Sequence, residues 1–301
     1  MSLIDVILKG KRKNFDRVYR GQSGVASYVD DGVFSIRNVR YHPSCGSDHM
    51  MDVFKPDDAS HSFPAILYVH GGGLAMGNRE YCFKFCRNLA KQGYVVYSIG
   101  YRLIPDVKIY DQLNDIARAM DFVYRNSNVF GSDKENTYMV GDGAGALLIA
   151  YVIAMQKNKT MSRAFNVRPS NLDVNAVGLI DGMFYTTKMD KIGLAMSNSI
   201  YGKHFRKRAV HKFVNPSMKD ICGSLPPCYL VTGRRDSMHK YTLEFRNALD
   251  RNGVQNKISV FRKNDRRLAH AFPVFHPEYE ESMGVIRNMT EFFKEHYTKM
   301  R

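Results

Sequence analysis

The stretch that decides the fold runs from residue 137 to residue 155 and reads TYMVGDGAGALLIAYVIAM. Its first four residues are β-branched, aromatic or aliphatic, and its last ten are apolar. Between these runs Gly141, Gly143 and Gly145 alternate with Asp142 and Ala144. Glycine permits the close backbone approach and the positive φ that a tight turn needs. The stretch therefore predicts a buried strand, a sharp turn and a buried helix.

The same alternation extends outward along the chain. Runs of mostly apolar residues predict further strands at residues 51–54, 65–69, 94–99, 176–180, 229–232 and 257–261. Apolar residues at helical spacing predict helices at residues 79–91, 113–125, 238–250 and 278–296. Fully apolar strands that alternate with helices are typical of a parallel sheet covered on both faces. The predicted fold class is α/β, with residues 183–224 as an insertion that interrupts the alternation.

Composition narrows the class of protein. Of the 301 residues, 44% are hydrophobic and 12% aromatic, which excludes a disordered or collagen-like chain. The net charge is +15, but the small basic clusters at residues 9–13, 206–208 and 262–267 are scattered. A scattered charge favours a generally basic enzyme-like domain, and we expect no nucleic-acid partner.

Cysteine usage and the apolar runs bear on the compartment. The five cysteines form no CxxC pair, and Cys82 and Cys86, at helical spacing, are predicted to be buried free thiols. The apolar run at the N-terminus is broken by Asp5 and precedes its basic residues, the wrong order for a secretory signal. The longest apolar run, 144–155, is about half of a membrane span. We expect a cytoplasmic protein with no membrane span.

A first glycine-rich loop, His70-Gly71-Gly72-Gly73, follows the apolar run at residues 65–69. Consecutive glycines leave backbone N–H groups open to a substrate oxygen. Such donors can form an oxyanion hole. A flexible turn is the plainer interpretation of the same residues.

The second glycine-rich loop, Gly141 to Gly145, has two interpretations. Gly141, Gly143 and Ala146 fit the dinucleotide fingerprint G-x-G-x-x-G/A. That fingerprint requires a second strand with an acidic end about 20 residues later. Residues 160–164 read TMSRA, which is basic and not strand-like, and at least two strands precede the motif. The dinucleotide interpretation is therefore disfavoured.

The other interpretation is a nucleophile elbow, G-x-S-x-G, in which Gly143 stands at the serine position. The N–H of Ala144 would then be a second oxyanion donor, and Asp142 would point away from the pocket. Asp236 and His270 each follow a later strand, and the order nucleophile, acid, histidine is that of α/β-hydrolases. Asp181 and Asp142, near strand ends, are interpreted as local caps, and Ser98 and Ser217 lie elsewhere in the pattern.

Several further motifs carry a family resemblance. They are HGGG at 70–73, YRLIP at 101–105, FGSD at 130–133, GDGAG at 141–145, LPP at 225–227 and HAF at 270–272. With them, from about residue 51 to the end, the chain resembles the hormone-sensitive-lipase-like carboxylesterases of the α/β-hydrolase superfamily. The resemblance implies one domain, residues 1–301, with a mostly parallel central sheet and helices on both faces. It also implies a small helical cap, approximately residues 1–45 and 183–224.

The resemblance also implies a chemistry. In the serine form His270 would take the proton of the nucleophile, Asp236 would orient the imidazole, and Gly72, Gly73 and Ala144 would hold the oxyanion. It implies a small-molecule ester or acyl ligand and neither a metal nor an organic cofactor. The motif residues are His70, Gly71, Gly141, Asp142 and Gly145.

The one departure from the family pattern falls on the nucleophile. Gly143 has no side chain and cannot form an acyl-enzyme, and loss of such a serine costs about a million-fold in rate. We expect an esterase-type site that is inactive as written. A natural pseudoenzyme that binds a small acyl or carboxylate ligand and an engineered knockout both stay open, and the sequence leaves the oligomeric state undetermined.

Overall fold

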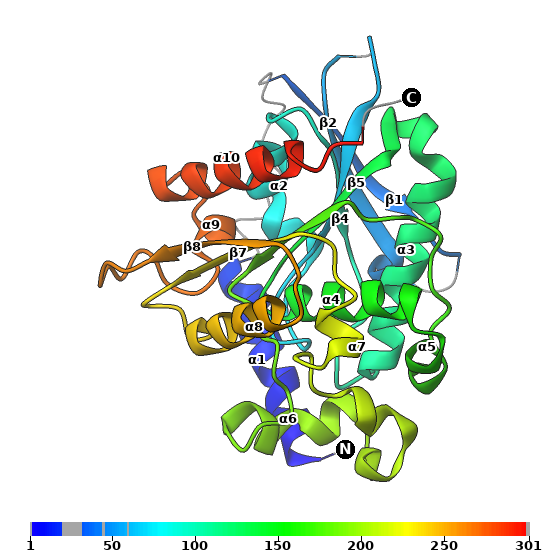
Figure 1. Cartoon of the computed structure of the whole chain (residues 1–301), viewed down its shortest axis with the longest axis vertical. Helices are drawn as coiled ribbons and strands as arrows, with labels where there is room; N and C mark the ends of the chain where they lie inside the picture. Colours follow the sequence, from blue (N-terminus) through cyan, green and yellow to red (C-terminus); the bar gives the residue numbers. More distant parts are fainter. Residues whose placement is uncertain (1, 20–31, 44–45, 59, 299–301) are drawn as a thin grey trace.

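A mixed eight-stranded sheet organises the molecule, which the computed structural model describes at residues 2–19, 32–43, 46–58 and 60–298 (Figure 1). The strand order is β1-β2-β4-β3-β5-β6-β7-β8. β1 and β2 pair antiparallel, as do β2 and β4, and all other neighbours are parallel. The strands are β1 (Val33–Arg40), β2 (Met50–Pro56), β3 (Phe63–Val69), β4 (Val95–Ile99), β5 (Ser132–Asp142), β6 (Ala176–Ile180), β7 (Cys228–Gly233) and β8 (Asn256–Phe261). The predicted α/β class with a mostly parallel sheet is confirmed.

Helices cover both faces of this sheet. They are α1 (Leu3–Tyr19), α2 (Phe83–Ala90), α3 (Ile109–Phe130), α4 (Ala144–Lys157), α5 (Lys159–Phe165), α6 (Lys191–Tyr201), α7 (Lys219–Cys222), α8 (His239–Arg251), α9 (Phe272–Phe275) and α10 (Glu280–Lys294). Side chains of α2, α9 and α10 form the core on one face. Side chains of α3, α4, α5 and α8 form the larger core on the other face. Cys82 and Cys86 are buried free thiols, as predicted, and Cys45 lies outside the described residues.

The backbone at the start of α4 packs directly against the backbone at the end of β3. Gly143, the residue before the helix, has φ 49° and ψ −113°. A Cβ on Gly145 would overlap the carbonyl of Val69 at the end of β3. A Cβ on Gly141 would lie 2.9 Å from the same carbonyl oxygen. From Ala144 to Met155 every residue of α4 is buried, as an all-apolar helix requires.

The part of the chain that connects β6 to β7 forms a layer of short helices, and α1 packs against this layer. The segment contains α6 and α7 with two 3₁₀ turns, Phe205–Lys207 and Ala209–Phe213. Ser199 of α6 donates a hydrogen bond of 2.9 Å to the Asp5 carboxylate of α1. Figure 1 shows α1 and α6 together at the end of the molecule that carries the N-terminus.

One part of the predicted cap belongs to the sheet instead. Residues 33–40 form the edge strand β1, so their assignment to a cap segment of residues 1–45 is wrong. The register with β2 shifts between Ile36 and Val39, and Asn38 has φ 59°. This irregularity breaks the apolar alternation by which a strand is recognised. Residues 20–31 and 44–45 of the predicted segment lie outside the described residues.

The close packing at the start of α4 can be tested by replacing two glycines that lie in helices. We expect Gly145→Ala to lower the free energy of unfolding by about 1–3 kcal/mol, because the added methyl group meets the Val69 carbonyl. Gly284→Ala in α10 is the matched control. Nothing lies within 4 Å of its Cβ position, so this change should stabilise the protein by about 0.5–1 kcal/mol. Urea unfolding followed by circular dichroism measures both, and equal effects would refute the close packing.

Candidate functional site

Residues 70–73, the glycine loop, leave β3 directly beside the turn at Gly143. His70 is buried, and burial lowers its pKa to about 4, so the imidazole is neutral near pH 7. Its ring stacks on Tyr101 with the ring centres 4.2 Å apart. The Tyr101 hydroxyl donates to the His70 carbonyl at 2.7 Å. These contacts fix the first residue of the loop.

Space requires glycine at two positions of this loop, and a positive φ favours it at the third. A Cβ on Gly71 would overlap the Asp142 carboxylate, and one on Gly72, at φ 108°, would overlap the Met76 carbonyl. Gly73 has open space around its Cβ position but a φ of 62°. Among the described residues the N–H groups of Gly72, Gly73 and Ala144 have no acceptor. Three backbone donors of the predicted oxyanion hole are thus free for a ligand oxygen.

Asp142 connects the glycine loop to the turn at Gly143. Its Oδ1 accepts from the N–H of Gly71 at 2.8 Å and from the Tyr68 hydroxyl at 2.5 Å. Burial raises the pKa of this carboxyl, while both hydrogen bonds oppose that rise. Asp142 therefore holds the loop, which agrees with its interpretation as a local structural residue.

Gly143 lies at the centre of the site. Its N–H donates to the Ile180 carbonyl at 2.8 Å, and its carbonyl accepts from the N–H of Met183 at 2.9 Å. A Cβ built on Gly143 would lie 3.2 Å from Nε2 of His270 and 3.9 Å from Cα of Gly71. A side chain at this position would therefore emerge between the imidazole and the glycine loop.

Asp236 and His270, which are 34 residues apart in sequence, are brought together. Oδ1 of Asp236 lies 2.6 Å from Nδ1 of His270, and Oδ2 accepts from the Thr232 hydroxyl at 3.0 Å. Burial lowers the pKa of His270, but the hydrogen bond and negative charge of Asp236 outweigh it and raise the pKa overall. Burial raises the pKa of Asp236, yet the bond to His270 brings it below its ordinary value. The pair favours an ionised Asp236 that orients the imidazole.

A third carboxyl group, Asp181, lies beside this pair. It follows β6 with φ 48°, and its Oδ2 accepts from the N–H of Ala271 at 2.6 Å. Burial and the negative charge of Asp236 raise the pKa of Asp181 well above its ordinary value. The sequence placed Asp181 only as a local cap. The signal that could have found it is its position at the carboxyl end of the strand next to β7.

Asp181, Asp236 and His270 are also the residues that could offer ligands to a cation. One ligand atom from each lies within 4.8 Å of the others, the only such set among the described residues. Nδ1 of His270 is already engaged by Asp236, and Asp181 by Ala271. Their observed contacts therefore fit proton transfer and positioning better than metal ligation.

The two other serines considered as nucleophiles lie elsewhere. The Ser98 hydroxyl is buried and donates to the Arg79 carbonyl at 3.0 Å. Ser217 shares a hydrogen bond of 2.5 Å with the Tyr185 hydroxyl. Neither hydroxyl is hydrogen-bonded to His270, so neither replaces a side chain at position 143.

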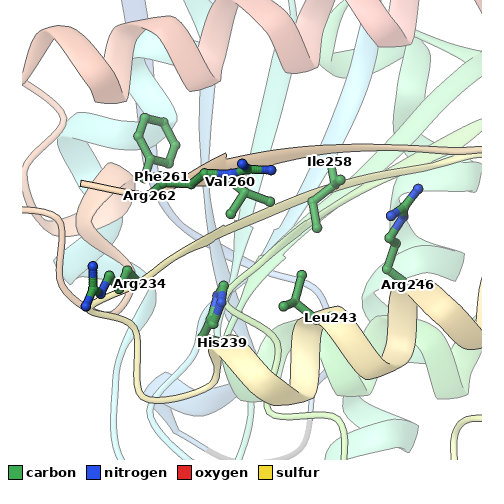
Figure 2. Close-up of a pocket in the computed structure, with 8 residues that line it drawn as sticks. All are labelled: Arg234, His239, Leu243, Arg246, Ile258, Val260, Phe261 and Arg262. Atoms are coloured by element: carbon green, nitrogen blue, oxygen red, sulfur yellow. The ribbon is translucent and has the colours of Figure 1, made fainter. Parts of the chain in front are cut away.

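An open basic groove lies between α8 and β8 (Figure 2). One of its lining residues, His239, lies close to the surroundings of Asp236. It encloses about 650 Å³. Its lining residues are Arg234, His239, Leu243, Arg246, Ile258, Val260, Phe261 and Arg262. Nδ1 of His239 lies 3.3 Å from the same Thr232 hydroxyl that donates to Asp236. The groove thus touches the site through one hydroxyl group, and three of its eight lining residues are arginines.

Comparison with known proteins agrees with this architecture. A family model described as alpha/beta hydrolase fold matches residues 66–273. The chain is 25% identical over 222 residues to a protein named "Probable isoprenylcysteine alpha-carbonyl methylesterase" from Arabidopsis thaliana, covering 70% of this chain and 47% of that protein. A protein of the same name from Oryza sativa subsp. japonica is 32% identical over 234 residues, covering 70% and 52%. The chain spans about half the length of these relatives.

A solved structure extends the likeness to nearly the whole chain. Esterase B from Lactobacillus rhamnosis superposes with a TM-score of 0.88 at 23% identity, covering 97% of this chain and 94% of that one. At this identity the match establishes the fold alone. Within the described residues, no helix combines the length and apolar character needed to cross a membrane.

The Asp236–His270 pair predicts a titration. We expect the His270 ring protons to titrate with a pKa above 6.5, and Asp236→Asn to bring the pKa below that value, because burial then dominates. By linkage, the bond stabilises the fold fully below about pH 6.5, and this contribution is lost as pH rises through the raised pKa. NMR titration of the histidine ring signals measures both. Asp250→Asn on the exposed side of α8 is the control, and an unchanged pKa in Asp236→Asn would contradict the pairing.

Proposed function

Because the chain belongs to a family with the alpha/beta hydrolase fold, we propose that its site is that of a carboxylic-ester hydrolase with Gly143 at the nucleophile position. The observation that carries the proposal is the direction of a side chain at residue 143. Its Cβ would lie 3.2 Å from Nε2 of His270, whose Nδ1 is held by Asp236 at 2.6 Å. A serine hydroxyl there would reach a base that is already oriented.

The mechanism of the serine form follows from this geometry. The hydroxyl would attack the ester carbonyl while Nε2 of His270 takes its proton, and Asp236 would stabilise the imidazolium that forms. The free N–H groups of Gly72, Gly73 and Ala144 would hold the negative oxygen of the tetrahedral intermediate. His270 would then protonate the leaving alcohol, and water would release the acid in a second, equivalent step. Asp181 would keep the Ala271 backbone in place through the hydrogen bond that it accepts from the Ala271 N–H.

With Gly143 the first covalent step has no nucleophile. The oxyanion donors and the base remain, and together such groups support about a thousand-fold acceleration over water. Methylesterases and esterases among the similar proteins support a small-molecule carboxylic ester as the ligand. The proposed chemistry uses neither a metal nor an organic cofactor.

A second candidate is a non-catalytic protein that binds a small acyl or carboxylate ligand in the same pocket. Two observations favour it: Gly143 lacks the nucleophile, while the Asp236–His270 pair and the three free N–H groups are intact. A carboxylate oxygen could accept from the donors that would otherwise hold an oxyanion. Saturable binding without turnover would distinguish this protein from an esterase.

Restoring the hydroxyl tests the proposal. We expect Gly143→Ser to raise kcat/KM for p-nitrophenyl acetate or butyrate by about a thousand-fold or more, since the acyl-enzyme can then form. His270→Ala in the Gly143→Ser background should remove most of this gain. Stopped-flow or steady-state release of p-nitrophenol measures all three proteins.

Gly143→Ala is the matched control, because it adds the same Cβ at φ 49° without a hydroxyl. It should stay at the rate of the unchanged chain. Turnover by the unchanged chain that equals the serine form would show a nucleophile outside position 143. Background rates in a correctly folded Gly143→Ser protein would leave the binding function as the better account of the pocket.

A further inference from the structure

Exposed apolar side chains gather on α1 and α6, two helices that touch through Asp5 and Ser199. Of the eleven large hydrophobic side chains that are exposed among the described residues, six lie on α1, on α6 or in the loop just before α6. These are Leu3, Val6, Ile7, Val18, Met189 and Leu194, and the four on α1 form what we call the apolar face. Met189 is 84%, Leu3 76% and Leu194 66% exposed. Clusters of this kind mark interaction sites more often than single exposed residues do.

The apolar face gives α1 the geometry of an interfacial helix. At 3.6 residues per turn, Leu3, Val6, Ile7 and Val18 fall within an arc of about 120° on its outer side. Gly10, Asn14 and Arg17 share this arc, so its apolar part is concentrated in the first two turns. Lys11 and Lys13 lie about 20° beyond the two edges of that arc. An apolar stripe bordered by lysines is the pattern of helices that lie in the surface of a lipid bilayer.

The inward side of α1 is occupied by other contacts. Lys9 pairs with Asp106 at 2.6 Å, and Nε of Arg12 donates to the Ala75 carbonyl at 2.7 Å. The Tyr81 hydroxyl donates to Asp16 at 2.9 Å. The helix is thus fixed to the body of the protein, and its apolar stripe faces solvent without a covering element among the described residues.

The positive charge around the apolar face indicates what kind of surface binds there. Lys11, Lys13 and Lys191 are exposed and pair with no carboxylate of the described chain. Residues 183–224, which contain α6, hold eight Lys or Arg against two Asp and no Glu. A second copy of the chain on this face would bring like charges together. An anionic lipid surface offers both a negative charge and an apolar layer.

We propose that the apolar face, with its flanking lysines, docks the protein peripherally on an anionic lipid membrane. The apolar side chains of α1 enter the headgroup boundary, and Lys11 and Lys13 bind lipid headgroups. Docking is independent of ester hydrolysis, so it can succeed or fail whatever the outcome at Gly143.

Vesicle flotation of the full chain tests the proposal. We expect binding to phosphatidylcholine vesicles that contain phosphatidylserine, weaker binding to phosphatidylcholine alone, and loss of binding with added salt. Leu3→Gln with Ile7→Gln should lower the partition coefficient about tenfold or more. Lys11→Gln and Lys13→Gln should each lower it about fivefold on anionic vesicles.

Val129→Gln is the matched control. Val129 is 75% exposed but lies near the far end of α3, a helix of 22 residues whose first turn contacts the α6 region through Tyr110. That distance is about 30 Å, so its replacement should leave vesicle binding unchanged. If circular dichroism shows that the double variant of α1 loses helix, the single change Val6→Gln, at a side chain that is 51% exposed, provides the same test.

Three results would overturn the proposal. The first is equal binding to anionic and uncharged vesicles or to neither. The second is a loss in Val129→Gln as large as that in the α1 variant. The third is self-association in analytical ultracentrifugation that Leu3→Gln with Ile7→Gln abolishes while no vesicle binding occurs, which would make this face an interface between copies.

Discussion

The close backbone contact between the start of α4 and the end of β3 is the constraint on which the site depends. No side chain fits at Gly145 against the Val69 carbonyl, and none fits at Gly71 against Asp142. Because the two segments touch through their backbones, Gly143 is held at φ 49° with its Cβ direction toward His270. The glycine loop and the imidazole then face one small volume from opposite sides. The arrangement is rigid because each part is hydrogen-bonded, with Asp142 joining the loop to the elbow.

The charged groups Asp236 and His270 stabilise each other although position 143 carries no nucleophile. The hydrogen bond to His270 keeps the pKa of Asp236 below its ordinary value, while burial and the charge of Asp236 raise the pKa of Asp181 well above its own. A buried carboxylate without a partner would be costly, so the pair stabilises itself as much as it serves chemistry. A non-glycine residue at the backbone angles of position 143 costs about 1–3 kcal/mol of strain. Glycine avoids that strain, so the backbone at position 143 holds these angles at no such cost.

The sequence predicts those parts of the fold that depend on local pattern. Runs of mostly apolar residues located the seven strands from β2 to β8, and the order of Asp236 and His270 after successive strands pointed to a shared site. β1 was missed because the irregularity at Asn38 disrupts its alternation. Asp181 was undervalued because an aspartate at a strand end resembles a cap until its neighbour on β7 is known. The outward face of α1 was equally hidden, since an amphipathic pattern does not say which face the body of the protein covers.

Helix α1 connects the outer surface of the protein with the site. Arg12 reaches inward to the Ala75 carbonyl, and the N–H of Ala75 in turn donates to the Gly72 carbonyl in the glycine loop. Lys11 and Lys13, its neighbours in sequence, point to the outer side, because adjacent residues of a helix lie about 100° apart. One helix therefore uses its cations in two ways, inward to brace the glycine loop and outward toward solvent. A surface that binds the outer side would hold the α1 end of the molecule against it, with the glycine loop fixed to the inner side of the docked helix.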